Sequence, residues 1–346
     1  MEFAFTPDQR LFQDAVRDLL AKECPVDEVR AAWESEGPGR SESRWAQLAE
    51  MGVLGITTPE AFGGLGMDEL DLVLLLEEAG RVCLPEPLVE TVAVSAPLLA
   101  DLSAGSGGAA AAEWLPKIVA GDGVVTVGFE RDVYVSEGAT AELLLLERDG
   151  ELHAVPWADA AVVSQRSVDR ARRLARVEWT PTSETLLASG DEASSGLSAA
   201  FDRGVLGVSA MLLGVTQQLL DVTVEYATAR EQFGQPSGGF QAVKHHLADT
   251  KLRLEFARPM VYRAAWTVAG RGGAVDARER ATHVSMAKSY AAEAAAFAAK
   301  TSLQVHGAIG YTFEYDLHLW MKRAWALAGQ WGDAAWHRRR VAAAVL

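Results

Sequence analysis

An arginine at a corner between two helical patterns is the first residue in this sequence that could do chemistry. The segment that starts there reads Arg230-Glu231-Gln232-Phe233-Gly234-Gln235-Pro236. A new helical pattern then begins with the pair Phe240-Gln241. A guanidinium at such a corner can hold a phosphate group through forked, charge-assisted hydrogen bonds. An arginine that caps the end of a helix fits the same pattern, and the spacing taken alone favours that structural role.

A turn that contains two glycines is the second candidate. It reads Gln304-Val305-His306-Gly307-Ala308-Ile309-Gly310-Tyr311-Thr312. The glycines allow backbone N–H groups to approach an anion without side chains in the way. A helix that ends at Gly307 explains the same residues, and His306 taken alone is more typical of a packed or capping histidine than of a catalyst.

Long helices must position these two segments. Apolar residues recur at helical spacing from about Leu197 onward, and they predict four helices, at 198–229, 240–270, 276–305 and 315–344. Four long helices in succession, with short glycine-bearing connections, predict an antiparallel bundle. Arg230 then ends the first helix of this bundle, and Gly307 follows the third.

Shorter helices and a small β unit precede the bundle. Thr6, Pro7 and Gln9 form a helix start signal. Further helical patterns lie at 45–51, 67–82 and 89–102. Short β-branched or alternating segments predict strands at 123–135, 142–147, 152–157 and 176–179. We therefore expect a mainly α chain with an N-terminal helical domain at 1–120, a reduced middle β domain at 121–196 and a C-terminal four-helix bundle at 197–346.

Composition excludes several classes of protein. The 346 residues include 32 Lys and Arg against 47 Asp and Glu, a formal net charge of −15. This acidic balance argues against a nucleic-acid partner. Two isolated cysteines, Cys24 and Cys83, form neither a disulfide framework nor a metal site. We see no signal peptide and no apolar run near the ~20 residues of a membrane span, so we expect a cytoplasmic protein without a membrane partner.

Taken together, the candidate segments resemble the acyl-CoA dehydrogenase family of flavoproteins over nearly the whole chain. The matching residues are Thr6 to Arg10, the Gly52-to-Gly66 loop, Leu115 to Ile118, the Arg-x-Gln-Phe-Gly segment at Arg230, Phe240-Gln241, and Gln304 to Tyr311. The resemblance implies the acyl-CoA dehydrogenase fold. It also implies that a glutamate removes the α-proton of an acyl-CoA while the β-hydride passes to FAD. The electrons then leave to an electron-transferring flavoprotein.

The same resemblance indicates what this chain lacks. The family places its catalytic glutamate in a last loop, Glu-Gly-Thr-x-Gln, or on the helix ahead of the arginine corner. The equivalent positions here are Gly332 and Gly204, so neither candidate base has a side chain. The loop's Thr and Gln are replaced by Ala334 and Trp336. The family's flavin-ring strand, Thr-Glu followed by Gly-Ser-Asp, is replaced by residues 127–133 without that motif.

The surviving motifs are those that the family lends to a neighbouring subunit, where they hold the adenine and pyrophosphate of the neighbour's FAD. The candidate cofactor-binding residues are Arg230, Gln232, Phe233, Gln241, Gln304, Val305, His306, Gly307 and Ala308. This selective loss resembles the shorter, base-lacking subunit of the heteromeric α2β2 acyl-CoA dehydrogenases of actinobacterial steroid side-chain degradation.

We therefore expect a subunit that supplies half of a shared FAD site, while a longer partner chain supplies the catalytic glutamate. The resemblance suggests a steroid side-chain CoA thioester as substrate, with linear or polyketide-derived acyl-CoAs left open. Two alternatives also stay open. One is a self-sufficient homomeric dehydrogenase or oxidase that uses Asp333 as its base, and the other is a flavin-free structural subunit.

Overall fold

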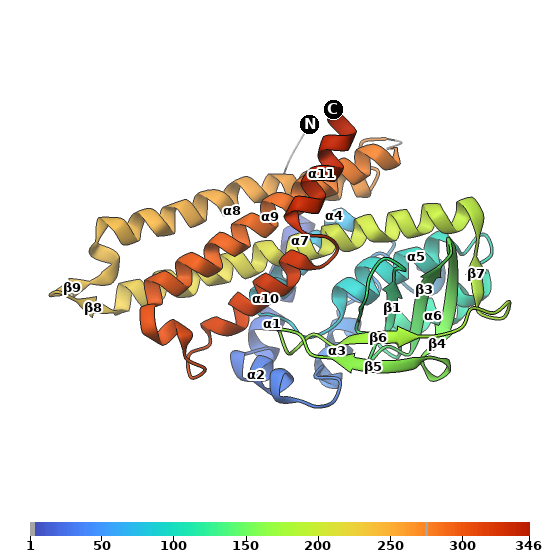
Figure 1. Ribbon diagram of the computed structural model, residues 1–346, viewed down its shortest axis with the longest axis horizontal. Coiled ribbons are helices and arrows are strands. Elements are labelled where there is room, and N and C mark those ends of the chain that lie inside the picture. Colours follow the sequence, from blue (N-terminus) through green and yellow to red (C-terminus); the bar gives the residue numbers. More distant parts are fainter. Residues whose placement is uncertain (1–3, 274–275) are drawn as a thin grey trace. The chain divides into compact units, whose positions relative to one another are not determined.

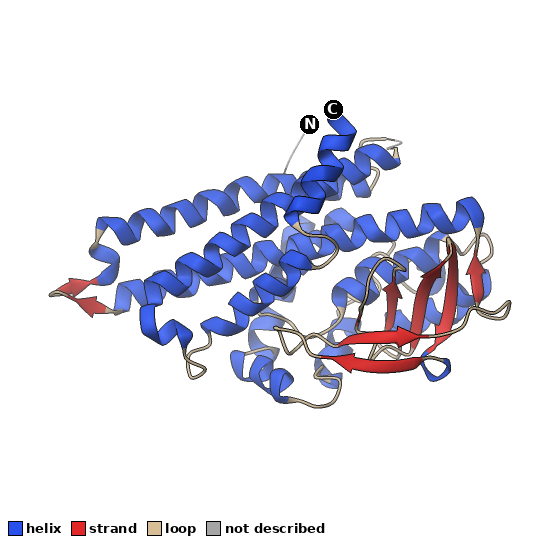
Figure 2. Ribbon diagram, viewed as in Figure 1, coloured by secondary structure: helices blue, strands red, loops and turns tan. Residues whose placement is uncertain are grey.

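The computed structural model describes residues 4–273 and 276–346 (Figure 1). The chain forms two compact units, each built from more than one stretch of sequence. Unit 1 combines the segment that ends at Val29 with Val73–Leu84 and Val205–Leu346. Unit 2 combines Arg30–Leu72 with Pro85–Gly204. Figure 2 shows that helices dominate and that strands are few, which confirms the predicted mainly α fold class with a small β content.

Unit 1 is a helical bundle. Its long helices are α1 (Pro7–Glu23), α8 (Gln241–Val268), α9 (Ala277–His306), α10 (Leu317–Gly329), α11 (Ala334–Val345) and the second part of α7 (Gly190–Ala229). The start signal at Thr6 is confirmed as a capping box. The Thr6 hydroxyl accepts from the Gln9 N–H at 3.2 Å, and the Gln9 amide oxygen accepts from the Thr6 N–H at 2.9 Å. The helices predicted at 198–229, 240–270 and 276–305 are confirmed as α7, α8 and α9.

The single helix predicted at 315–344 is wrong, because α10 and α11 are separate helices. The backbone between them turns into the left-handed region at Trp331 (φ 59°) and Gly332 (φ 92°). Buried Lys288 ends α10 by donating hydrogen bonds to the carbonyl oxygens of Leu327, Ala328 and Gln330 at 2.8, 3.0 and 2.9 Å. Its positive charge therefore lies at the negative end of the α10 dipole.

Two glycines allow α4 (Glu69–Arg81) and α7 to cross in close contact within unit 1. A Cβ atom added to Gly80 would lie 2.1 Å from the Met211 carbonyl oxygen, and one added to Gly214 would lie 1.8 Å from that of Glu77. Neither position has room for a side chain, so the crossing depends on both glycines.

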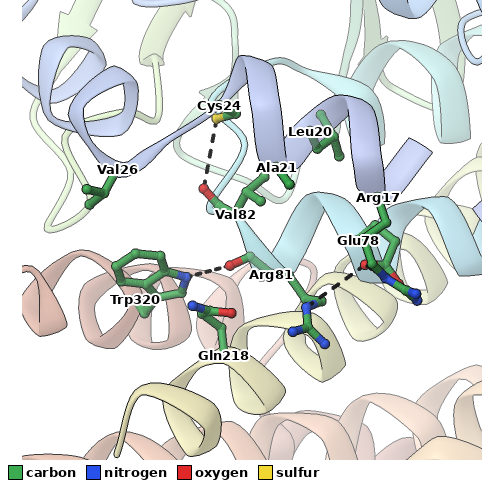
Figure 3. Close-up of a pocket in the computed structure, with 10 residues that line it drawn as sticks. All are labelled: Arg17, Leu20, Ala21, Cys24, Val26, Glu78, Arg81, Val82, Gln218 and Trp320. Carbon is green, nitrogen blue, oxygen red and sulfur yellow. Dashed lines mark hydrogen bonds and ion pairs between the residues drawn. The ribbon is translucent and has the colours of Figure 1, made fainter. Parts of the chain in front are cut away.

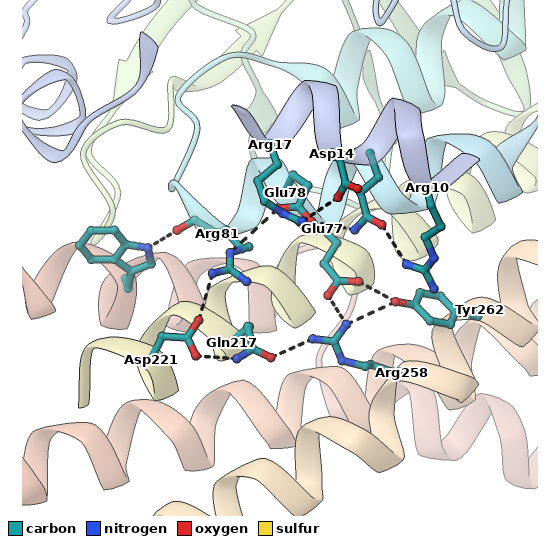
Figure 4. A network of polar contacts seen from close by, with 12 residues as sticks. Arg10, Asp14, Arg17, Glu77, Glu78, Arg81, Gln217, Asp221, Arg258 and Tyr262 are labelled. Carbon is teal, nitrogen blue, oxygen red and sulfur yellow. Dashed lines mark hydrogen bonds and ion pairs between the residues drawn. The ribbon is translucent and has the colours of Figure 1, made fainter. Parts of the chain in front are cut away.

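Adjacent glutamates on α4 bind two other helices near this crossing (Figure 4). Glu77 accepts a hydrogen bond from the Tyr262 hydroxyl at 2.8 Å and pairs with Arg258, both on α8. Glu78 accepts from the Arg17 guanidinium of α1 at 2.7 Å. Both carboxylates are almost fully buried. Their charges are tolerated because each one is paired and hydrogen-bonded.

Unit 2 contains α3 (Glu42–Glu50), the π-helix η2 (Leu88–Ser95), α5 (Ala96–Asp101), α6 (Gly108–Ala120) and two small sheets. The first sheet has the order β1 (Val125–Gly128), β3 (Leu143–Arg148), β4 (Glu151–Pro156), β7 (Leu186–Ala188). The second has the order β2 (Val135–Ser136), β6 (Leu174–Glu178), β5 (Ala161–Gln165). Only β1 and β3 pair in parallel; the other described pairs in these two sheets are antiparallel.

The structure refines several of the sequence predictions for unit 2. The segment predicted as one strand at 123–135 divides between β1 and β2, which belong to different sheets. The sequence did not predict β5 and β7. The helical pattern predicted at 89–102 begins as η2 and continues as α5.

Helix α7 is long and apolar enough to span a membrane by length and composition. Within the described structure, however, 78% of its most apolar window is buried, which is typical of a core helix.

A buried carboxyl in unit 2 gives a testable pH dependence. Glu137 accepts hydrogen bonds from the Arg173 N–H at 3.2 Å and the Thr140 hydroxyl at 2.9 Å. Burial, reinforced by the charge of Glu90, raises the pKa of Glu137 to about 7. The folded chain therefore holds a proton that the unfolded chain releases near pH 4.5, and stability falls as the pH rises between these values.

We expect Glu137→Gln to remove this loss, because the amide stays neutral at every pH. Unfolding by urea should show the stability advantage of the variant over wild type growing from pH 5.5 to pH 8, up to about 3 kcal/mol at pH 8. Glu184→Gln, at an exposed position, is the control and should leave the pH profile unchanged. Equal effects of Glu137→Gln at both pH values would contradict the assignment.

Candidate functional site

The arginine corner lies at the end of α7, followed by a hairpin of two short strands, β8 (Glu231–Gln232) and β9 (Gln235–Pro236). The Arg230 carbonyl oxygen accepts from the N–H and the hydroxyl of Ser237 at 2.7 and 2.9 Å, which fixes its backbone. Its guanidinium is exposed and makes no hydrogen bond or ion pair with any residue that the structure describes. The Arg230 side chain therefore does not cap the end of α7, which was the structural role that the sequence left open.

The tip of the hairpin presents an aromatic ring to solvent. The side chain of Phe233 is 94% exposed and its backbone is left-handed, with φ of 53°. The ring lies edge-on to Phe240, with 6.1 Å between the ring centres. Gln232 and Gln241, on either side of these rings, are also exposed. An exposed aromatic ring with amides nearby is typical of a surface that receives a ligand or a partner.

The glycine turn lies at the end of α9. Gln304, Gly307 and Ala308 are exposed, and Val305 is half-buried. Gly307 has φ of 65°, and a Cβ atom placed there would have no neighbour within 4 Å. The backbone of this turn is therefore open to an incoming group.

His306 joins the two candidate segments. Its ring is buried and stacks on Tyr226 in the last turn of α7, with 4.3 Å between the ring centres. Tyr226 precedes Arg230 by one helical turn, and the Arg230 N–H donates to its carbonyl oxygen at 2.8 Å. The bundle thus brings the arginine corner, the start of α8 and the glycine turn to one end of unit 1, as Figure 1 shows.

Both ring nitrogens of His306 are used within the chain. Nδ1 lies 2.7 Å from the Ser302 carbonyl oxygen, which can only accept, so Nδ1 carries the proton. Nε2 lies 3.2 Å from the Tyr315 hydroxyl and accepts from it. Burial lowers the pKa of His306, which keeps the ring neutral. The ring points into the bundle, so it positions the turn that follows.

The loop where the family resemblance places a catalytic glutamate is closed to a side chain. A Cβ atom added to Gly332 would lie 2.8 Å from the Trp336 ring and 2.9 Å from His337 Nε2. His337 is fully buried, and its Nε2 donates to the Trp331 carbonyl oxygen at 2.8 Å. Asp333 is exposed and caps α11, because its carboxylate accepts from the Trp336 N–H at 2.7 Å.

In unit 2, the other candidate base position is buried, and aromatic side chains occupy the region after the strand β1. Gly204 is buried within α7. After β1, the Phe129 ring lies edge-on to Phe201, with 5.7 Å between the ring centres. The Arg131 guanidinium carbon lies 3.7 Å from the centre of the Phe201 ring. This cation–aromatic stack follows the strand where the resemblance places a flavin ring.

A pocket that the sequence did not predict lies within unit 1 between α1, α4, α7 and α10, with a volume of about 360 Å³ (Figure 3). Two guanidinium groups line it, but Arg17 pairs with Glu78 at 2.7 Å and Arg81 with Asp221 at 3.0 Å. Its thiol, that of Cys24, is buried. Because these cations are already neutralised, nothing in the pocket selects an anionic ligand.

Comparison with known proteins finds a matching domain family at each end of the chain. The family model described as the acyl-CoA dehydrogenase N-terminal domain matches residues 6–122, and the C-terminal domain model matches residues 196–346. The acyl-CoA dehydrogenase IpdE2 of Mycolicibacterium smegmatis is 32% identical, over 98% of this chain and 99% of its own length. IpdE2 of Mycobacterium tuberculosis is 31% identical, over 92% of this chain and 91% of its own length.

Solved structures show the same fold. A chain of the ChsE4-ChsE5 complex from Mycobacterium tuberculosis superposes with a TM-score of 0.85 at 24% identity, covering 99% of this chain and 98% of that one. A chain of the Tcur3481-Tcur3483 steroid ACAD superposes with a TM-score of 0.83 at 26% identity, covering 98% and 97%. The full-length match to IpdE2 and the two domain matches show that this chain belongs to the acyl-CoA dehydrogenase family.

Proposed function

We propose that this chain is the base-lacking subunit of a heteromeric FAD-dependent acyl-CoA dehydrogenase. In this proposal it supplies the adenine and pyrophosphate half of a shared FAD site, and a longer partner chain supplies the catalytic glutamate. The observation that carries the proposal is Gly332, whose side-chain space is already taken by Trp336 and His337. The three-domain division at 1–120, 121–196 and 197–346 is part of the same proposal.

The residues at the hairpin end of unit 1 suit the polar half of FAD. The exposed Arg230 guanidinium provides forked donors for a pyrophosphate, and the amides of Gln241 and Gln304 offer both donors and acceptors. The open turn at Gly307 and Ala308 admits a bulky group. Gln232, Phe233 and Val305 complete this surface, and His306 sets the position of the turn. When bound, FAD supplies the hydride acceptor for the α,β-desaturation.

The flavin-ring half of the chain's own site does not suit FAD. The residues after β1 form the stack of Phe129, Arg131 and Phe201 in place of the family motif. In this proposal the chain therefore retains residues for the adenine and pyrophosphate half of a flavin site, while side chains of the chain itself occupy the flavin-ring half. This contrast favours FAD at an interface with a partner over FAD bound by one chain.

The substrate is proposed by analogy with relatives. One solved neighbour is a steroid ACAD, and another lies in a complex of two differently named chains, ChsE4 and ChsE5. We therefore propose a steroid side-chain CoA thioester as substrate and an electron-transferring flavoprotein as electron acceptor. This substrate assignment rests on analogy with proteins of the same fold, because no described residue is identified as recognising a steroid ring.

Both alternatives meet a specific obstacle. A self-sufficient enzyme would need Asp333 as its base, but that carboxylate caps α11 through the Trp336 N–H. A flavin-free subunit would have no use for the exposed Arg230 guanidinium. The filled space at Gly332 further disfavours the self-sufficient enzyme, because the family's usual base cannot be placed there.

The test is to express this chain alone and together with the product of its neighbouring gene, the candidate for the longer subunit. We expect the chain alone to purify without flavin absorbance and without turnover of a steroid side-chain CoA thioester with an artificial electron acceptor. The complex should hold one FAD per pair of chains and turn the thioester over. Asp333→Asn, which keeps a good helix cap but cannot act as a base, should leave that turnover unchanged. Stoichiometric FAD and acyl-CoA oxidation by the chain alone would overturn the proposal, and so would a flavin-free complex.

A further inference from the structure

Strand β5 forms an open edge of the second sheet in unit 2. It pairs with β6 on one side only, and Figure 1 shows it at the margin of that sheet. Ala161, Val163 and Ser164 are exposed, and the exposed fraction of Val163 is 58%. Among the strands that the structure describes, no other edge strand reaches five residues. An exposed edge presents backbone N–H and C=O groups that can pair with another chain.

The edge of β5 lacks the features that usually protect a sheet edge, which are lysine, proline and a β-bulge. Its sequence is Ala-Val-Val-Ser-Gln, and it pairs with β6 in register from Ala161 to Gln165 without a bulge. Outside this pairing, its backbone makes no backbone hydrogen bond with any described residue. The Gln165 side chain approaches the Val163 carbonyl oxygen at 3.5 Å, which is long for a hydrogen bond. The edge is therefore available to an incoming strand.

Arginines gather in the loop that leaves β5, which we call the basic loop (residues 166–173). Arg166 and Arg170 are exposed, and neither side chain makes a hydrogen bond or an ion pair with a described residue. On β6, the exposed Arg176 is the register partner of Val163. Arg176 lies 3.8 Å from Glu178 in an exposed ion pair, which is a weak interaction. Positive charge therefore remains at this end of β5, although the whole chain carries −15.

The basic loop is held in place, so its arginines have defined positions. The buried Asp169 carboxylate accepts a hydrogen bond from the Ala171 N–H at 3.1 Å. The Arg173 guanidinium donates to the Gly37 carbonyl oxygen at 2.9 Å, which ties the loop to the segment after α2 (Val26–Glu34). These contacts fix the backbone of the loop and leave its two unpaired arginines in solvent.

We propose that the edge of β5 binds an acidic peptide segment of another protein, in extended conformation, as an added strand. The peptide backbone pairs with the free N–H and C=O groups of β5, which provides affinity for any sequence that can extend. An apolar side chain of the peptide packs against Val163. Acidic side chains face Arg166 and Arg170, which gives the site its preference for negative charge.

This proposal does not depend on the proposed function. None of the residues assigned to FAD belongs to β5 or to the basic loop. Loss of FAD binding would therefore leave the peptide site standing, and loss of peptide binding would leave the shared FAD site standing.

The experiment titrates a fluorescein-labelled octapeptide of alternating valine and glutamate with the full-length chain at about 50 mM salt. Fluorescence anisotropy should show saturable binding. The same peptide with lysine in place of glutamate should bind at least about 10-fold more weakly, because like charges meet at the basic loop. Equal binding of the two peptides, or no binding of the glutamate peptide, would refute the proposal.

A third peptide separates strand pairing from attraction between charges alone. It keeps the glutamates but is N-methylated at every backbone nitrogen, so it cannot donate to β5. We expect its Kd to be at least about 10-fold higher. If it binds as tightly as the unmodified peptide, the added strand does not form and the proposal fails.

Hydrogen–deuterium exchange locates the bound peptide. Saturation with the glutamate peptide should slow the fastest backbone amides of residues 161–165 at least about 10-fold. Binding without this protection would contradict the assignment to β5. Protection already present in the free chain at every concentration would mean that another strand, such as one from a second copy, occupies the edge, and would also contradict it.

Charge reversal tests the role of the basic loop. Arg166→Glu and Arg170→Glu should each weaken binding of the glutamate peptide at least about 5-fold, and the double variant should prefer the lysine peptide. Arg339→Glu makes the same change of charge at an exposed position on α11, and it is the matched control with an unchanged Kd. Circular dichroism would verify the fold of each variant. A double variant that still prefers glutamate, or an equal loss with Arg339→Glu, would count against the proposal.

Discussion

Gly214→Ala is expected to destabilise unit 1 by more than about 3 kcal/mol. The added Cβ atom would lie 1.8 Å from the Glu77 carbonyl oxygen and 2.7 Å from the Arg81 nitrogen, and both atoms belong to the α4 backbone. Backbone cannot rotate away as a side chain can, so α4 and α7 would have to separate. Separation would also disturb Glu77, whose carboxylate is buried and paired with Arg258. Urea unfolding followed by circular dichroism measures the loss.

Gly329→Ala is the matched control for this prediction. Like Gly214, Gly329 lies in a helix, as the last residue of α10. A Cβ atom added to Gly329 would have no neighbour within 4 Å. Alanine is favoured over glycine in helices, by about 1 kcal/mol in a helix interior. We therefore expect Gly329→Ala to be neutral or mildly stabilising. Equal losses from the two variants would show that the close helix crossing does not limit stability.

Arg230→Ala is expected to weaken FAD binding by the assembled enzyme by about 2 to 3 kcal/mol, or roughly 30- to 150-fold in Kd. The reason is the loss of charge-assisted hydrogen bonds from an exposed guanidinium that no described residue engages. The fold should be unaffected, because Ser237 holds the backbone carbonyl of Arg230 and not its side chain. Flavin absorbance during dialysis, with Kd from fluorescence titration, measures the effect.

Two further variants make this measurement specific. Arg339→Ala removes an equal charge from an exposed position on α11, and we expect it to leave the Kd unchanged. Arg230→Lys keeps the charge but loses the forked geometry, so its Kd should lie between those of wild type and Arg230→Ala. Retention of full FAD affinity by Arg230→Ala would favour the flavin-free alternative.

The local signals in the sequence predicted the helices well, whereas the break after α10 depends on tertiary contacts. Thr6 and Gln9 cap α1 as their spacing requires. By contrast, apolar residues continue at helical spacing across the segment between α10 and α11, so periodicity predicts one helix there. The helix ends here because Lys288 donates hydrogen bonds to the last carbonyl groups of α10, and His337 donates one to the carbonyl oxygen of Trp331. Both partners are remote or lie beyond the break, so no local pattern reveals them.

The candidate site shows a similar division. The family resemblance, and not the residue types alone, predicted that Arg230 and the turn at Gly307 act together, and the stack of Tyr226 on His306 links the two segments within the bundle. The sequence could not indicate that His306 faces inward with both ring nitrogens engaged. It also could not locate the buried pairs of Glu77 and Glu78, because their partners come from α1 and α8.

The loop at Gly332 has a consequence for the history of this chain. Restoring a glutamate at that one codon would not restore an acid–base group, because the new side chain would meet Trp336 and His337 and would have to adopt a left-handed backbone. The contacts with Trp336 and His337 would have to be removed as well before a glutamate could occupy this position. In the role proposed for this chain, the filled loop would therefore keep it dependent on the catalytic glutamate of its partner.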